Sequence, residues 1–248
     1  MYNDMAGKLL DGYEIKARLL PAFITLAPII LVPYVLFPDV RSAWGALGGV
    51  LAALGLTAAL ARFARAMGTR CQAALFESWD GPPATAMLRH SDDRINAVTK
   101  AKMHAALGTS GPRLNMPNAN EEAADPVAAD EIYDAAVDWL RRHTRESSQY
   151  PLVFAENISY GFMRNLYGMK PLGIVFSVMS LGVVGTAIYY SASSGLAVNY
   201  ALMITALVIQ ATLLVYWLWH IKPSAVRVPA EGYARALLEC CWDIGTES

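Results

Sequence analysis

Apolar and polar segments alternate along the chain in a pattern typical of membrane proteins. Two uncharged segments, 19–37 and 43–61, precede a long polar stretch, 62–170, and two more, 171–190 and 196–221, follow it. Each uncharged segment is close to the roughly 20 residues that a helix needs to cross the hydrocarbon of a bilayer. We therefore predict an all-α membrane protein with four transmembrane helices, arranged as two hairpins that flank a helical domain at 62–170.

The two ends of the chain are polar and carry weaker signals. Residues 1–18 are predicted to form either a short helix at the membrane surface or a frayed terminus with basic flanks. In the C-terminal segment, 222–248, the spacing of apolar residues predicts an amphipathic helix from about Pro229 to Trp242. The apolar face of that helix consists of Tyr233, Leu237, Leu238 and Cys241.

Basic residues next to the four apolar segments predict how the protein is oriented. They gather at one side of the segments, while the turns 38–42 and 191–195 hold only Arg41; the flanking residues are Lys8, Lys16, Arg18, Arg62, Arg65, Arg70, Arg164, Lys170, Lys222 and Arg227. Since basic residues next to spans favour the cytoplasmic side, both termini and the domain at 62–170 are predicted to be cytoplasmic.

Within 62–170 the pattern predicts helices only. The second span should continue as a helix to about Ser78 and stop at the Gly-Pro-Pro turn that follows Asp80. Ser91 is predicted to cap the next helix, which ends near Gly108, and 109–120 should be a loop. Asp125 followed by Pro126 predicts another helix start, with a last helix at 152–167. The inner face of the helix after Asp125 is predicted to consist of Ile132, Ala136, Trp139 and His143.

Composition excludes several functional classes. The net charge is −1, which offers no field for nucleic acid. The three cysteines, Cys71, Cys240 and Cys241, have neither disulfide-framework nor metal-ligand spacing. The apolar segments hold no Asp, Glu, Lys or Arg between their ends, which disfavours an ion-coupled transporter. We find no cofactor-binding motif and expect no cofactor.

The first candidate site is the segment from Trp79 to Asp93. It places Trp79, Asp80, Arg89, His90 and Asp92 around a Gly-Pro-Pro turn. Arginine pairs with phosphate or carboxylate in a forked geometry, and tryptophan offers a stacking face, so the segment could bind a small ligand. The structural alternative is a rigid turn followed by a capped helix.

A second candidate is a helix face in the segment 156–165. Glu156, Tyr160 and Arg164 lie four residues apart and therefore share one face of the predicted helix. This face is expected either to contact the helix that continues from the second span or to bind a ligand or partner. Small residues at close spacing in the apolar segments predict tight helix packing at Gly45, Gly49, Gly182 and Gly185.

Metal binding and nucleophilic catalysis are weak alternatives. His90, Asp92, Asp93 and His104 are potential metal ligands, but their spacing matches no known metal motif, and we predict no metal site. Cys71 with His90 or His104 would be the only thiol–imidazole pair, and nothing in the sequence activates that thiol. Whether the protein is an enzyme stays open, with binding favoured.

Two apolar hairpins around a helical cytoplasmic insert resemble the layout of small four-helix pore-forming effectors of bacterial anti-phage defence. The segments 82–90 and 160–166 resemble uncharacterised bacterial membrane proteins. The resemblance implies an oligomeric, multi-pass protein of the bacterial inner membrane, whose cytoplasmic domain senses a small-molecule signal or a soluble protein and controls membrane permeability. The alternatives are a membrane anchor that recruits a soluble partner, and a membrane-bound enzyme that uses the segment 79–93.

Overall fold

The computed structural model describes residues 15–37, 56–109 and 114–244, and their regular secondary structure is entirely helical. Helix makes up 83% of the structure and the described residues contain no strand. Three helical stretches are long and apolar enough to cross a membrane, namely Ile15–Leu36, Pro151–Ser194 and Tyr200–His220. The expected class, an all-helical membrane protein, is thus confirmed at this level, and the predicted second span at 43–61 lies largely outside the described residues.

The chain divides into two compact units. The membrane unit comprises 1–71 and 161–226, and the polar unit comprises 72–160 and 227–248. The predicted domain began at Arg62 and ended at Lys170. The compact unit is shorter at both ends because 62–71 and 161–170 pack on each other and on the first helix, and it gains the C-terminal segment instead.

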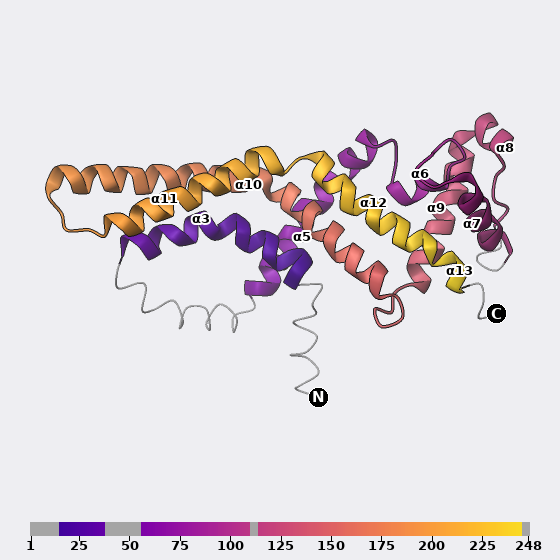
Figure 1. The fold of residues 1–248 in the computed structure, drawn as a ribbon, viewed down its shortest axis with the longest axis horizontal. Coiled ribbons are helices and arrows are strands. Elements are labelled where there is room, and N and C mark those ends of the chain that lie inside the picture. Colours follow the sequence, from indigo (N-terminus) through magenta and orange to yellow (C-terminus); the bar gives the residue numbers. More distant parts are fainter. Residues whose placement is uncertain (1–14, 38–55, 110–113, 245–248) are drawn as a thin grey trace. The chain divides into compact units, whose positions relative to one another are not determined.

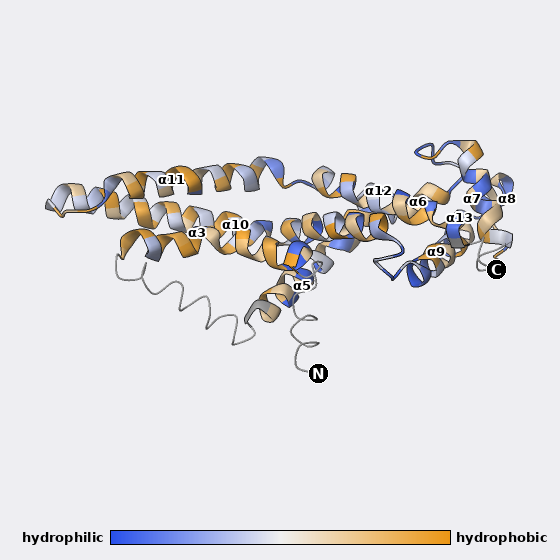
Figure 2. Ribbon diagram, turned by 60° about the horizontal axis from the view of Figure 1, so that its bottom comes forward, coloured by the Kyte–Doolittle hydropathy of each residue, from blue (hydrophilic) through white to orange (hydrophobic). Residues whose placement is uncertain are grey.

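The membrane unit is built on a long antiparallel hairpin. Helix α10 runs from Pro151 to Ser194, and after Gly195 the chain returns as α11 (Tyr200–Val215) and the π-helical turn η2 (Tyr216–His220). Helix α3 (Leu20–Leu36), preceded by the π-helical turn η1 (Ile15–Leu19), packs against α11 (Figure 1). These helices are mostly apolar over their length (Figure 2), so the unit has the surface that a bilayer requires.

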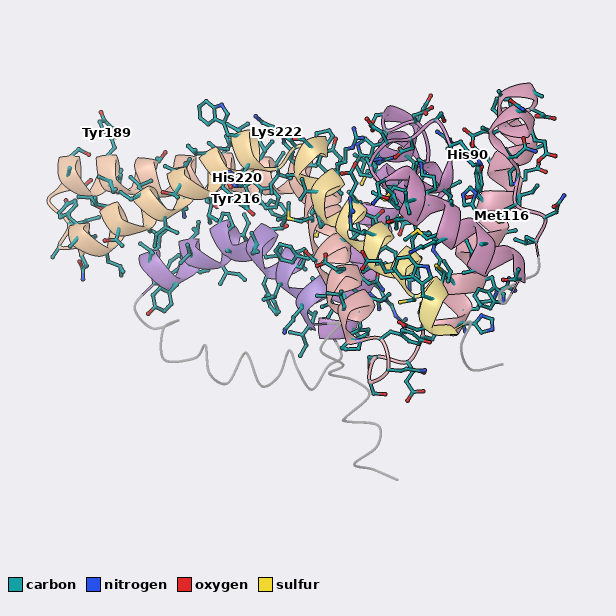
Figure 3. The ribbon with its side chains drawn as sticks, turned by 45° about the vertical axis from the view of Figure 1, so that its right-hand side comes forward. His90, Met116, Tyr189, Tyr216, His220 and Lys222 are labelled. Atoms are coloured by element: carbon teal, nitrogen blue, oxygen red, sulfur yellow. The ribbon has the colours of Figure 1, made fainter. Side chains whose placement is uncertain are left out.

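Polar and aromatic side chains mark both ends of this hairpin. Tyr189 lies near the turn, whereas Tyr216, His220 and Lys222 lie at the opposite end (Figure 3). At that opposite end the Lys170 ammonium donates a hydrogen bond of 2.7 Å to the carbonyl oxygen of Ile221. The helical rise from Lys170 to Tyr189 is about 28 Å, which matches the hydrocarbon thickness of a bilayer.

One polar level interrupts the apolar interior of the hairpin. Helices α10 and α11 run antiparallel, with Trp217 against Gly173 and with Val184 and Ala206 in one buried cluster. Ser180 and Gln210 lie between these two contacts along the hairpin and therefore stand at the same level. Ser180 and Gln210 are buried. Among the described residues, neither the Ser180 hydroxyl nor the Gln210 amide has a hydrogen-bond partner.

Helix α5 (Leu56–Ser78) crosses α10 at a contact that only glycine permits. A Cβ atom on Gly168 would lie 2.4 Å from the carbonyl oxygen of Met67, and one on Gly68 would lie 2.1 Å from Asn165 Oδ1. The buried Asn165 amide also donates a hydrogen bond of 2.7 Å to the carbonyl oxygen of Ala17 in η1. Asn165 therefore joins three segments of the membrane unit at one point.

The polar unit has a core formed by short helices and the C-terminal segment. Its helices are α6 (Pro83–Leu88), α7 (Ala97–Thr109), α8 (Ala119–Ala124), α9 (Pro126–His143), α12 (Pro223–Glu239) and α13 (Cys241–Ile244), together with the polar-unit ends of α5 and α10. Fully buried members of its core include Met87, Leu88, Leu107, Tyr133, Leu140, Leu237 and Leu238. The predicted apolar face of the C-terminal helix is thus covered by the protein's own core.

Several sequence-based expectations for this unit need correction. The helix predicted to begin after Ser91 is α7, and it begins at Ala97. The Asp92 carboxylate binds Arg94 instead of a helical N–H group. The Asn96 side chain accepts the N–H of Thr99 in the first turn of α7. The loop expected at 109–120 ends earlier, because α8 (Ala119–Ala124) begins at Ala119, where Asn118 and Glu121 make a reciprocal capping box.

Other expectations concern particular helix faces. The buried face of α9 consists of Ala129, Tyr133, Ala136, Val137 and Leu140, while Ile132 and Trp139 lie at its edge and His143 is exposed. A Cβ atom on Gly182 or Gly185 would meet nothing within 4 Å, so neither glycine packs against a helix of the described chain. Gly45 and Gly49 lie outside the described residues. The Asp125 cap of α9 is confirmed. The helix predicted at 152–167 and the segment 171–190 form one continuous helix, α10, which passes through Pro171.

The glycine crossing leads to a first prediction. Gly168→Ala places a methyl group against the backbone of Met67, which cannot move away, and should destabilise the protein by about 1–3 kcal/mol. Gly182→Ala in the same helix meets no neighbour and should be neutral or slightly stabilising, since alanine has the higher helix propensity. Thermal unfolding in detergent measures both. Equal unfolding temperatures for the two variants would contradict the described crossing.

Candidate functional site

The candidate site is organised by the turn that ends α5. Asp80 and Gly81 both have positive φ, of 63° and 112°, which reverses the chain before α6. A Cβ atom on Gly81 would lie 3.0 Å from the Arg89 guanidinium. Glycine is needed here because it adopts this conformation freely and leaves room for the arginine.

Arg89 is held by two carboxylates. Its Nε and Nη2 atoms donate to the two oxygens of Asp130 in α9, at 2.8 and 2.7 Å, in a forked pair. Its Nη1 donates to the Asp80 carbonyl oxygen at 2.8 Å and to the Asp80 carboxylate at 2.7 Å. Hydrogen bonding to Asp130 raises the pKa of Arg89 further above its usual value. An anionic ligand would therefore have to displace a carboxylate from this arginine.

Glu122 in α8 is a buried carboxylate with three donors. It accepts hydrogen bonds from the backbone N–H of His90 (2.6 Å), the backbone N–H of Ser91 (3.0 Å) and the Tyr133 hydroxyl (2.7 Å). Burial alone would raise the pKa of Glu122, but these donors outweigh it and lower the pKa to about 2. The Glu122 side chain therefore stays ionised at neutral pH.

Helix α7 binds the carbonyl groups of the same loop. The buried Lys100 ammonium donates to the carbonyl oxygens of Arg89 and Asp92, and burial lowers its pKa. His104 Nε2 donates to the carbonyl oxygen of Leu88 at 2.8 Å, and burial lowers the pKa of that imidazole. Side chains thus bind a backbone group of every residue in the segment 88–92, and these hydrogen bonds fix its conformation.

A cavity of about 600 Å³ opens beside this loop. Its polar lining includes Asp80, Arg89, His90, Ser91, Glu122 and Asp130, and its apolar lining comes from α8 and α9. His90 Nε2 donates to the carbonyl oxygen of Pro117 at 2.9 Å. Three carboxylates face one guanidinium, so the cavity has a negative field that favours cationic groups.

Two other predicted residues of this segment lie beside the cavity rather than in it. Trp79 is buried and packs on Phe76, with ring centroids 6.0 Å apart. Asp92 forms an ion pair with Arg94 at 2.6 Å, and Arg94 reaches Glu231 of α12 at 2.9 Å. Asp92 therefore ties the loop to the C-terminal helix.

The second candidate face is divided between the two units. The Glu156 carboxylate lies against Gly232, where a Cβ atom would be 2.7 Å from Oε2, and the Tyr160 ring stacks on Tyr233 at 6.3 Å. Both contacts are to α12 within the polar unit. Arg164 belongs to the membrane unit, where its carbonyl oxygen lies 3.9 Å from Cys71 Sγ. In the described residues, the contact with α5 therefore involves Arg164 and Asn165, whereas Glu156 contacts α12.

Cys71 has a structural environment. Its thiol donates to the carbonyl oxygen of Gly68 at 3.0 Å, and burial raises its pKa, which disfavours a thiolate. Cys71 lies in the membrane unit and both histidines lie in the polar unit. In the described part of the chain, no three His, Cys, Asp or Glu side chains cluster closely enough to hold a metal ion.

Sequence reasoning missed Glu122, Asp130 and Lys100. The acidic run 121–138 reads as dipole-compensating charge on a helix, and nothing local shows that two of its carboxylates turn inward. Asp130 and Asp134 do lie four residues apart, on the helix face that meets Arg89 and Thr85. That spacing was the one available signal.

Comparison of the chain with protein families, with curated proteins and with solved structures finds no match.

The Glu122 network leads to a second prediction. Because the folded-state pKa of Glu122 lies below its unfolded value of about 4.5, the carboxylate contributes stability above pH 4.5 that is lost as the pH falls towards 2. At pH 7 Glu122→Gln should cost on the order of 3 kcal/mol. Thermal unfolding of the full chain in detergent at pH 7 and pH 3 measures it.

The matched control is Glu131→Gln, since Glu131 is exposed in the neighbouring helix. This variant should unfold like the wild type at both pH values, and the difference between Glu122→Gln and wild type should shrink at pH 3. A Glu122→Gln variant as stable as Glu131→Gln at pH 7 would contradict the network.

Proposed function

We propose that the protein is a membrane-embedded sensor whose polar unit binds a cationic ligand and thereby controls membrane permeability. The observation that carries the proposal is the cavity beside 88–92, lined by three carboxylates and one arginine. Its size, about 600 Å³, suits a small organic molecule or the side chains of a peptide.

The lining groups favour binding over catalysis. The Arg89 guanidinium and the Glu122 carboxylate are held by protein partners, and the Nε2 atom of His90 donates to the carbonyl oxygen of Pro117. A preorganised acidic cavity of this kind recognises charge and shape. The enzyme alternative has no observation in its favour.

Two helices offer a route from the cavity to the membrane. Helices α5 and α10 each contribute residues to both units, and they cross at Gly68 and Gly168. A ligand that changes the polar-unit end of either helix therefore acts on an element that continues into the membrane unit. A packed glycine crossing supports a switch between discrete arrangements better than a gradual deformation.

Permeability would require several copies of the chain. Apolar side chains on the described spans are exposed, among them Val178, Val183, Ile204 and Val208. We propose a homo-oligomer in a bacterial inner membrane with the polar unit in the cytoplasm, an orientation that the flanking basic residues support.

A membrane anchor for a soluble partner is the second candidate. The C-terminal helix no longer offers an apolar docking face for it, because Leu237, Leu238 and Cys241 are buried in the polar unit. The exposed surface of 72–160 would have to bind the partner. Recovery of one stoichiometric soluble protein together with unchanged permeability would favour this candidate.

Filling the cavity tests the sensor. Val127 lines the cavity and is 72% exposed, so Val127→Trp should block it with little effect on folding. Val98 in α7 is 68% exposed and does not line the cavity, which makes Val98→Trp the matched control. Membrane depolarisation on induced expression in bacteria, followed with a voltage-sensitive dye, should be strong for wild type and Val98→Trp and weak for Val127→Trp.

Ligand class is tested on the full chain in dye-loaded liposomes. Spermidine should increase dye release from wild-type and Val98→Trp liposomes more than glutamate at equal ionic strength, and Val127→Trp should abolish the difference. If neither expression nor any added cation changes permeability, the proposal is wrong.

A further inference from the structure

Helix α5 has a basic face that begins at Arg62, directly after the predicted second span (43–61). Arg62, Arg65, Ala66, Thr69 and Arg70 line an open groove of about 430 Å³. At 100° per residue these positions fall within about 140° of the helix circumference. The buried residues Ala61, Ala64 and Gly68 lie on the opposite side, so the basic face points away from the protein's own packing.

Arg62, Arg65 and Arg70 have no carboxylate partner among the described residues. The described residues of the membrane unit contain no Asp or Glu. Basic residues gather at the end of this unit opposite the turn near Tyr189, namely Lys16, Arg18, Arg62, Arg65, Arg70, Arg164, Lys170 and Lys222. The four acidic residues at 4, 11, 14 and 39 lie outside the described residues.

The level of the face along the helix matches a lipid headgroup layer. The uncharged segment ends at Ala61, and the rise from Arg62 to Arg70 is about 12 Å. Headgroup and interfacial regions add roughly 5–8 Å on each side of the hydrocarbon, and long arginine side chains reach beyond their own Cα positions. Lys170 and the aromatic residues of η2 occur at the same end of the membrane unit.

We propose that Arg62, Arg65 and Arg70 form a binding face for anionic phospholipid headgroups on the membrane side that carries the polar unit. The guanidinium groups bind headgroup phosphates in forked pairs, and the Thr69 and Ala66 positions between them keep the groove open. An acidic soluble protein could bind these arginines only if they stood clear of the bilayer surface. Because the uncharged segment ends at Ala61, directly before Arg62, the arginines lie at the bilayer surface instead. This proposal is independent of the cavity in the polar unit.

Spin-labelled lipids test the face in the full-length protein. Wild type is reconstituted in phosphatidylcholine bilayers with a trace of spin-labelled phosphatidylglycerol or spin-labelled phosphatidylcholine, and the motionally restricted fraction is measured by electron paramagnetic resonance. The relative association of phosphatidylglycerol should exceed that of phosphatidylcholine by roughly twofold or more. In 1 M NaCl, where the Debye length is about 3 Å, the preference should largely disappear.

Variants assign the preference to this face. R62Q/R65Q/R70Q should bring the association of phosphatidylglycerol relative to phosphatidylcholine close to one. R62K/R65K/R70K keeps the positive charge and should retain part of the preference for phosphatidylglycerol. R141Q/R142Q/R145Q removes the same charge from exposed positions in the polar unit and should behave as wild type. Circular dichroism checks that each variant is folded.

Three results would overturn the proposal: a wild-type ratio of one, an unchanged ratio in R62Q/R65Q/R70Q, or an equal loss in R141Q/R142Q/R145Q. Because the wild-type measurement alone decides the first, the test does not depend on any variant folding. Displacement of the labelled lipid by low millimolar inorganic phosphate at constant ionic strength would show a free-anion site and would also contradict it.

Discussion

The membrane unit depends on the absence of two side chains where α5 meets α10. Gly68 and Gly168 let the two backbones approach until only hydrogen atoms fit between them, and the Asn165 amide fixes the crossing to η1. This crossing lies just beyond the apolar segment that ends at Ala61, and it is held by close backbone contact and by the buried hydrogen bond of Asn165. Residues 160–168, which look unusual as a sequence, are explained by this geometry.

In the polar unit the corresponding constraint is the connection after α6. Leu88 ends α6 and 89–92 is irregular, and backbone groups of these residues are bound by Lys100, His104 and Glu122 from two helices. A network in which each buried polar group has a partner fixes one loop shape. The cavity lies beside this loop, and the carboxylates that hold Arg89 also line it.

Sequence patterns predicted the parts of the structure that follow from local rules. Long uncharged segments predicted membrane-length helices, Asp125 before Pro126 predicted the start of α9, and apolar spacing predicted the buried face of the C-terminal helix. Prediction failed where a side chain's partner is distant in sequence. Ser91 and Asp92 look like the start of a helix until Arg94, which also binds Glu231 of α12, is seen to bind the Asp92 carboxylate. Glu122 looks like surface charge until Tyr133 and the backbone of His90 and Ser91 are seen to donate to it. Such pairings depend on tertiary packing, which overrides local preference.

The C-terminal helices have a consequence for how the protein is made. Ala234, Leu237, Leu238 and Cys241 complete the core of the polar unit, yet they follow α10 and α11 in the chain. Residues 72–160 are therefore synthesised before the helices that complete their core, with the apolar hairpin of α10 and α11 in between. Until then the apolar side of α9 lacks the cover that the C-terminal helices provide. The core of the polar unit is thus completed only after the apolar hairpin has been synthesised.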